Sequence, residues 1–141
     1  MRIVYMTSVC DRDHTISASA FSWATKLAES AERLDVIALE ARGDPPGNMH
    51  LHSLQRSMRK RRVAMLPDLW RSLERSTRQA DVIFCQYSTT WVFAAAPFAA
   101  LRRIPIVFWW SHAHVDTRLR AALRLSSAVV TSSEQSFRIP T

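Results

Sequence analysis

Two histidines and an aspartate occupy alternating positions in the stretch Ser111–Asp116, which reads SHAHVD and directly follows the apolar run VFWW. An imidazole can bind a metal ion, donate a hydrogen bond to a phosphate oxygen, or lie in a solvated loop. The pattern H-x-H-x-D therefore has three interpretations: a metal site, a site for a sugar and its phosphate, or the start of a helix. The surrounding elements have to distinguish between them.

The metal interpretation is the weakest of the three. H-x-H-x-D resembles the beginning of the binuclear zinc motif H-x-H-x-D-H of the metallo-β-lactamase-like hydrolases. Thr117 stands at the sixth position, and no histidine or cysteine follows His114. Two metal ions would therefore lack ligands. We predict no resident metal, and a hydrolase with a single zinc on His112, His114 and one outside ligand is the third alternative for the function.

The elements that position these residues alternate along the chain. Apolar and β-branched runs predict strands, and helical spacing of apolar residues predicts helices between them. We expect strands at 2–6, 34–40, 49–54 (a weak edge strand), 81–86, 104–110 and 127–132. We expect helices at 18–32, from near Pro67, from Thr89 or Thr90 to near 103, after Asp116, and at the start of SSEQSFR, with Ser17 as the first cap. Strands that are apolar on both faces are typical of a parallel sheet covered on both sides. The prediction is one doubly wound, Rossmann-like α/β domain over 1–141, with a mostly parallel sheet of six to seven strands and helices on both faces.

Composition limits the class of protein. The chain has 141 residues, 48% of them hydrophobic, so one domain can bury an adequate core. No apolar stretch has the length of a membrane span or a signal peptide, and Cys10 and Cys85 are expected to be packed thiols. We therefore expect a cytoplasmic protein. The loop after the first strand, TSVCDRDHTIS, contains no glycine. This excludes the G-x-G-x-x-G and P-loop nucleotide sites, so no cofactor is predicted.

The sequence around His112 resembles a known family. The run IPIVFWWSHAHVDTRLRAALRLSSAVVTSSEQSFRIP is similar to the amino-terminal half of GT-B retaining glycosyltransferases of the family 4 type, where a strand ending in W-Y-[ST]-H precedes a helix, a second strand and a segment ES-F-R. ADVIFCQYS and MRIVYMTS also resemble strands of that family. The glycine pair that the family has after its first strand is absent here, and Thr15, Ile16 and Ser17 stand in its place.

The resemblance implies a nucleotide-sugar donor, held mainly by a carboxyl-terminal domain that these 141 residues lack. We therefore expect the amino-terminal, acceptor-side half of a glycosyltransferase, inactive without its carboxyl-terminal domain or a partner chain, with a sugar or a lipid-linked acceptor. The alternative is a non-catalytic subunit that recruits a separate catalytic chain to membranes.

Site residues follow from the predicted sheet edge and from the resemblance. His112 is the candidate catalytic residue, because an imidazole at a strand end can stabilise charge on a leaving phosphate. A solvated loop histidine is its alternative. The candidate acceptor- or donor-binding residues are Asp13, His14, Thr15, Trp91, Ser111, Ser133 and Glu134. For the 13–15 loop the alternative is an ordinary connection, and for Ser133 and Glu134 it is a helix cap with an acid in the first turn.

A basic run precedes the helix predicted from near Pro67, and it contains Arg56, Arg59, Lys60, Arg61 and Arg62. The formal charge of the chain is +7, which favours anionic partners. The run fits an anionic lipid surface on the inner membrane face, although such runs are commonly solvated. Leu66, Leu69, Trp70 and Leu73 follow at helical spacing, and we expect this stripe to pack on the sheet rather than enter a bilayer. No nucleic-acid-binding module is recognisable, so no nucleic-acid partner is predicted.

Overall fold

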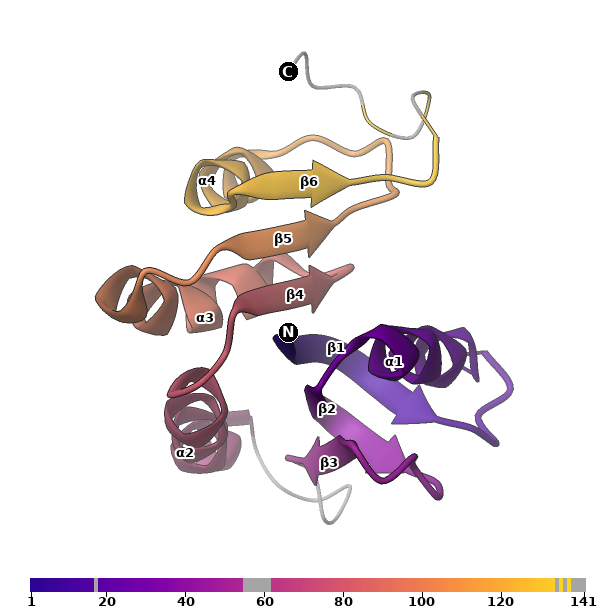
Figure 1. Ribbon diagram of the computed structural model, residues 1–141. Helices are drawn as coiled ribbons and strands as arrows, with labels where there is room; N and C mark the ends of the chain where they lie inside the picture. Colours follow the sequence, from indigo (N-terminus) through magenta and orange to yellow (C-terminus); the bar gives the residue numbers. More distant parts are fainter. Residues whose placement is uncertain (17, 55–61, 134, 136, 138–141) are drawn as a thin grey trace.

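The protein folds around one parallel sheet. The computed structural model describes residues 1–16, 18–54, 62–133, 135 and 137. In these residues six strands, all parallel to their neighbours, pair in the order β3-β2-β1-β4-β5-β6. The elements are β1 (Arg2–Asp11), α1 (Ala18–Ser30), β2 (Arg33–Arg42), β3 (Met49–Ser53), the short 3-10 helix η1 (Arg62–Met65), α2 (Leu66–Thr77), β4 (Val82–Gln86), α3 (Thr89–Arg102), β5 (Ile106–Trp109), α4 (Thr117–Leu125) and β6 (Ala128–Val130). This confirms the predicted Rossmann-like α/β fold (Figure 1).

The central strands are longer than their apolar runs predict. β1 pairs with β2 from Arg2↔Arg33 to Asp11↔Arg42, whereas the apolar run of β1 ends at Met6. Backbone hydrogen bonds to a neighbouring strand carry the ladder through polar residues that have weak strand propensity by themselves. β3 is the edge strand that the sequence predicted.

Helix α4 forms as its sequence predicts. Asp116 caps it, with Oδ1 accepting a hydrogen bond from the Leu119 amide at 2.7 Å. Leu119 and Ala122 are buried, and the arginines of this helix face outward. The cap of α3 differs from the prediction of Thr89 or Thr90: it is Ser88, whose Oγ accepts from the Thr90 amide at 3.3 Å. The predicted cap Ser17 lies outside the described residues, and so do Glu134, Ser136 and Arg138 of the helix predicted in SSEQSFR.

Helix α2 does not bury the stripe that its spacing predicts. Leu73 is 1% exposed, but Leu66 is 57% exposed and Trp70 is 59% exposed. The Trp70 ring lies edge-on to Phe98 of α3, with ring centroids 4.7 Å apart. The prediction was wrong for Leu66 and Trp70, because α2 lies beside α3 and offers only part of its apolar stripe to the core.

The two faces of the sheet are covered unequally. Buried residues of α2, α3 and α4 form one core cluster with the sheet, and those of α1 form the other. Figure 1 shows α1 over β1 and β2, with α3 and α4 on the opposite face. On the α1 side of β5 and β6, Trp109 is only half-buried, and Ala128 and Val130 are exposed. In the described part of the chain, no helix covers that end of this face.

Candidate functional site

The strand order places the candidate site at the carboxyl edge of the sheet. From β1, the chain adds β2 on one side and β4 on the other, so the order reverses between β1 and β4. In open α/β sheets, ligands bind in the crevice outside the carboxyl ends of the strands at such a reversal. The loops that follow β1, β4 and β5 meet at this edge. They contain five of the predicted site residues: Asp13, His14, Thr15, Ser111 and His112.

His112 lies three residues beyond β5 and is exposed. Trp110 holds its backbone, since Nε1 of Trp110 donates a hydrogen bond to the His112 carbonyl oxygen at 2.8 Å. The imidazole lies edge-on to the Trp110 ring, with centroids 5.2 Å apart, and 5.9 Å from the ring of Tyr87. Only the backbone of His112 takes part in the described hydrogen bonds, so both ring nitrogens are available to a ligand as hydrogen-bonding groups.

Tyr87 is a functional candidate that the sequence did not predict. It follows β4 with φ of 59°, a left-handed conformation that costs about 1–2 kcal/mol for a residue with a β-carbon. Its amide donates to the Trp109 carbonyl at 3.0 Å, which extends the β4–β5 pairing by one residue. Such strain is common at functional edges. No local sequence signal marks it, because tyrosine has no preference for positive φ.

A buried polar group lies beneath the same edge. Gln86, 2% exposed, accepts hydrogen bonds through Oε1 from the hydroxyl of Tyr5 and from Thr7 Oγ1, the latter at 2.9 Å. Burial raises the pKa of Tyr5 well above its usual range, so this hydroxyl stays protonated and donates. The three side chains link the middle of β1 to the last residue of β4, and these are the strands on either side of the reversal. The only sign of this buried polar group in the sequence was a polar residue, Gln86, at the end of a predicted strand.

The loop after β1 forms local turns. The Asp13 amide donates to Asp11 Oδ1 at 3.0 Å, and the Ile16 amide donates to His14 Nδ1 at 3.3 Å. Asp13 and Thr15 are exposed, while His14 is half-buried. The loop thus combines the turn geometry expected of a connection with exposed polar side chains at the ligand edge.

Trp91 and Ser88 line a cavity of about 420 Å³ that also reaches Ser8 in the second half of β1. The other lining residues are mostly apolar: Leu39, Leu54, Met65, Leu66 and Leu69, with Thr90. Trp91 is only 4% exposed, and its Nε1 has no hydrogen-bond partner among the described residues. The ring therefore packs into the core and offers a bound sugar little stacking surface.

The remaining predicted residues are less closely grouped. Ser111 is half-buried beside His112, and Ser133 is exposed beyond β6, where its carbonyl accepts from Thr131 Oγ1 at 3.2 Å. Glu134 and the basic residues Arg56, Arg59, Lys60 and Arg61 lie outside the described residues, and nothing is described of the Arg62 side chain.

The other chemistry-bearing residues show no site of their own. Cys10 and Cys85 are fully buried; burial raises the pKa of Cys10 to about 12 and also raises that of Cys85, so both are protonated thiols. His114 Nε2 lies 3.9 Å from Asp116 Oδ2. Within the described ranges, no three histidine, cysteine, aspartate or glutamate side chains gather as metal ligands. None of the helices in that part of the chain is long and apolar enough to cross a bilayer.

Comparison with known structures relates the whole domain to larger proteins. Anabaena HepE, crystallised with UDP and glucose, superposes with a TM-score of 0.62 at 17% identity, covering 96% of this chain and 39% of HepE. The UDP-GlcNAc 2-epimerase of Methanocaldococcus jannaschii gives 0.60 at 11% identity (96% and 40% covered), and MurG of Acinetobacter baumannii gives 0.57 at 14% identity (99% and 44% covered). The fold is that of one Rossmann-like half of a GT-B protein.

The chain spans about two fifths of the length of the structures it matches. At these identities the similarity concerns the fold. No protein-family model and no curated protein sequence matches the chain. The finer resemblance to the family 4 type thus rests on the sequence motifs alone.

Proposed function

We propose that the chain is the acceptor-side half of a nucleotide-sugar glycosyltransferase. The observation that carries the proposal is the placement of His112. It is exposed at the carboxyl edge, held by Trp110 through its backbone, and framed by the Trp110 and Tyr87 rings. The fold supports the proposal, because the matched half-domains include one from a protein crystallised with UDP and glucose.

In the proposed reaction, the carboxyl-terminal domain or a partner chain holds the nucleotide against this edge. His112 donates a hydrogen bond to a phosphate oxygen of the leaving nucleoside diphosphate while the bond from the anomeric carbon to that phosphate breaks. An acceptor hydroxyl oxygen bonds to the anomeric carbon, and its proton passes to the leaving phosphate. No base is then required from this half.

Acceptor binding is assigned to the loop after β1 and to the neighbouring cavity. Asp13, His14, Thr15 and Ser111 offer hydrogen-bonding groups for sugar hydroxyls. The cavity beside Trp91 is lined mainly by apolar side chains. It suits the apolar part of a lipid-linked acceptor better than a sugar, because Trp91 is buried and its neighbours offer few hydrogen bonds. Ser133 and Glu134, beyond β6, are proposed to face the donor.

The test begins with the size of the working protein. Intact mass spectrometry after immunoprecipitation from the source cells distinguishes a species about twice 16.1 kDa from a short chain with a partner. The assembled enzyme is then supplied with UDP-sugars, and UDP release is measured for the wild type, His112→Ala and the control His50→Ala, an exposed residue of edge strand β3.

Loss of His112 should lower kcat/KM at least about 100-fold, as expected for a group that stabilises developing charge. The thermal unfolding midpoint should stay unchanged, since the imidazole is exposed. His50→Ala should keep both activity and stability. Full turnover in His112→Ala would remove His112 from the mechanism. An assembled protein that releases no UDP from any UDP-sugar would contradict the proposed transferase activity.

A membrane-recruiting binding subunit is the second candidate. The observation that favours it is the exposure of Leu66 and Trp70 on α2, the helix that follows the basic run. Aromatic and aliphatic side chains next to basic ones suit the surface of an anionic bilayer, on the cytoplasmic side. Flotation with vesicles containing phosphatidylserine should retain the wild type and release Trp70→Ser. Equal binding to neutral vesicles would contradict the electrostatic part of this candidate.

A further inference from the structure

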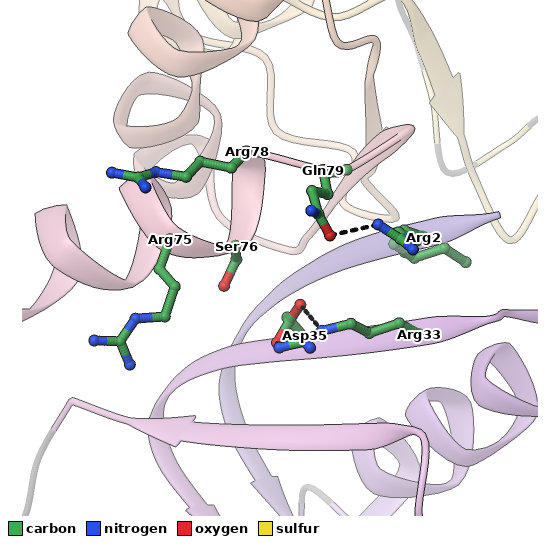
Figure 2. Close-up of a pocket in the computed structure, with 9 residues that line it drawn as sticks. Arg2, Arg33, Asp35, Arg75, Ser76, Arg78 and Gln79 are labelled. Atoms are coloured by element: carbon green, nitrogen blue, oxygen red, sulfur yellow. Dashed lines mark hydrogen bonds and ion pairs between the residues drawn. The ribbon is translucent and has the colours of Figure 1, made fainter.

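A second cavity, which is polar, lies at the opposite end of the strands from His112. It has a volume of about 320 Å³ and is bounded by the starts of β1 and β2 and by the last turn of α2 (Figure 2). Four of its lining residues are arginines, Arg2, Arg33, Arg75 and Arg78, and one, Asp35, is acidic. Nothing in the transfer mechanism uses these groups. Their concentration in one cavity points to an anionic ligand.

Two of the guanidinium groups are held in place by neighbours. Arg33 binds Asp35 through Nε and Nη2, at 2.9 and 3.0 Å, and Arg2 binds Glu32 through Nε and Nη2, at 3.1 and 2.8 Å. Arg2 also donates through Nη1 to Gln79, as Figure 2 shows. Each guanidinium carries five N–H donors, so both keep N–H groups for a ligand. Oriented guanidinium forks recognise phosphate well, because less side-chain entropy is lost on binding.

Ser76 supplies an independent observation. Its residue is 7% exposed, it lines the cavity, and its Oγ has no hydrogen-bond partner among the described residues. Figure 2 shows the hydroxyl on the side of α2 that faces Asp35 and β2. A buried hydroxyl without a partner costs about 1–3 kcal/mol, and rotation about its Cα–Cβ bond brings it to a ligand oxygen. A ligand that accepts this hydrogen bond would remove the cost.

Arg75 in the last turn of α2 and Arg78, which follows the helix, line the cavity and are exposed. Arg78 pairs with Glu74 at 3.3 Å, whereas Arg75 has no ion pair within the described residues. In Figure 2 both side chains extend outward from the helix. Both side chains are long enough to reach across a bound anion. Arg75 has no competing carboxylate, so we expect its interaction with a bound anion to be the more favourable of the two.

The carboxylates near the cavity are already neutralised. Asp35 faces Arg33 on one side and His52 on the other, with His52 Nε2 at 3.1 Å. Glu32 pairs with Arg2, and Glu74 with Arg78 and Arg102. An incoming anion therefore meets paired carboxylates, one unpaired arginine and an unpartnered hydroxyl.

We propose that this cavity binds the phosphate group of a small ligand, through Arg33, Arg75 and the hydroxyl of Ser76. A phosphate offers acceptors in several directions, which suits donors that come from both β2 and α2. The cavity lies at the lower end of the size range for ligand pockets, so it suits a phosphate or a phosphosugar rather than a whole nucleotide sugar. The site is separate from the transfer site, because the cavity lies at the start of β1 and the transfer site lies at the opposite end of the strands, and β1 extends from Arg2 to Asp11.

The test is an NMR titration of the full chain with inorganic phosphate, in which chloride is exchanged to keep the ionic strength constant. The amides of Ser76 and Arg33 should shift and saturate with a Kd on the order of 1 mM, whereas the His112 amide should not move. A parallel titration with glucose 6-phosphate identifies the source of the phosphate. Tighter binding would assign a phosphosugar, and equal binding would assign the phosphate group alone.

Matched variants test the contacts. Arg75→Ala should weaken binding about tenfold, as expected for a charge-assisted hydrogen bond, and Ser76→Ala about threefold to tenfold. Arg120→Ala removes an exposed arginine from α4 and should change the affinity less than about twofold. The unfolding midpoints of Arg75→Ala and Arg120→Ala should match the wild type, whereas that of Ser76→Ala should be equal or higher, because the substitution removes a buried hydroxyl without a partner. The site is overturned if no amide saturates, if the shifts centre on His112, or if Arg120→Ala weakens binding as much as Arg75→Ala.

Discussion

The two edges of the sheet are built on different principles. At the carboxyl edge, His112 and Tyr87 are exposed, and the imidazole is positioned by ring contacts and by one hydrogen bond to its backbone. At the amino edge, charged side chains are tied into ion pairs, among them Arg33–Asp35 at 2.9 Å. The first edge leaves its chemistry-bearing groups available to a ligand. The second has most of its charges paired with one another.

This difference predicts which substitutions affect stability and which affect function. Changes to the paired charges of the amino edge, such as Asp35, should act mainly on the free energy of unfolding. Changes at the carboxyl edge should act mainly on transfer, where the loss of His112 is the largest effect that we expect.

The strongest effect on stability is expected from Asp35→Asn. The Asp35 residue is 5% exposed and accepts hydrogen bonds from Arg33 and His52. Loss of its charge leaves Arg33 without its counter-charge, and we expect the free energy of unfolding to fall by about 2 kcal/mol, less than for a fully buried pair because Arg33 is half-exposed. Urea unfolding followed by tryptophan fluorescence measures it. Asp44→Asn, in an exposed loop, is the control, and an equal loss in both variants would contradict a special role for Asp35.

The same carboxylate should give the stability a defined pH dependence. Burial by itself would raise the pKa of Asp35, but hydrogen bonds from His52 and Arg33 outweigh it and lower the pKa from 3.8 to about 2. A lowered pKa in the folded state stabilises the protein above the unfolded value, and this stability is lost as the pH falls from about 4 to about 2. The stability difference between the wild type and Asp35→Asn should therefore shrink across that range. A constant difference would mean that the charge of Asp35 contributes nothing.

At the carboxyl edge, Trp110→Phe should separate positioning from folding. The substitution removes the N–H that holds the His112 carbonyl but keeps an aromatic ring. We expect kcat of the assembled enzyme to fall about threefold to tenfold, with a smaller change in KM and a loss of stability below about 1 kcal/mol. Trp23→Phe is the matched control, since Trp23 is exposed on α1 and has no described hydrogen bond. Equal kinetics in the two variants would leave Trp110 a purely structural residue.

The smallest effect concerns the left-handed backbone of Tyr87. Tyr87→Gly and Tyr87→Ala both remove the ring, but only alanine keeps the β-carbon that is strained at φ of 59°. The glycine variant should therefore be more stable than the alanine variant by about 1 kcal/mol, even though glycine gains more entropy on unfolding. Thermal unfolding of the pair measures the difference. An alanine variant of equal or greater stability would show that the conformation is not strained.

Several elements were predictable because their causes are local. Asp116 caps α4 as its sequence indicates, and alternation places Trp109 on the α1 face while Trp110 packs toward the opposite cluster. Capping and strand alternation depend on a few neighbouring residues. The helical stripe of α2 was read wrongly, because burial of Leu66 and Trp70 depends on how far α2 lies over the sheet, and spacing does not contain that distance.

The sequence by itself determined the class of fold and the position of His112 at the end of a strand, since apolar runs and helical spacing are written along the chain. Only the tertiary structure decided the sheet order, which sets the end of β4 beside the middle of β1 and lets Gln86 accept hydrogen bonds from Tyr5 and Thr7. The tertiary structure also decided the left-handed backbone conformation of Tyr87. It formed the cavity that contains Arg33 and Ser76, two residues that are 43 positions apart in the sequence. Contacts between distant residues arise from the packing of the whole sheet and its helices, which no short stretch of sequence specifies.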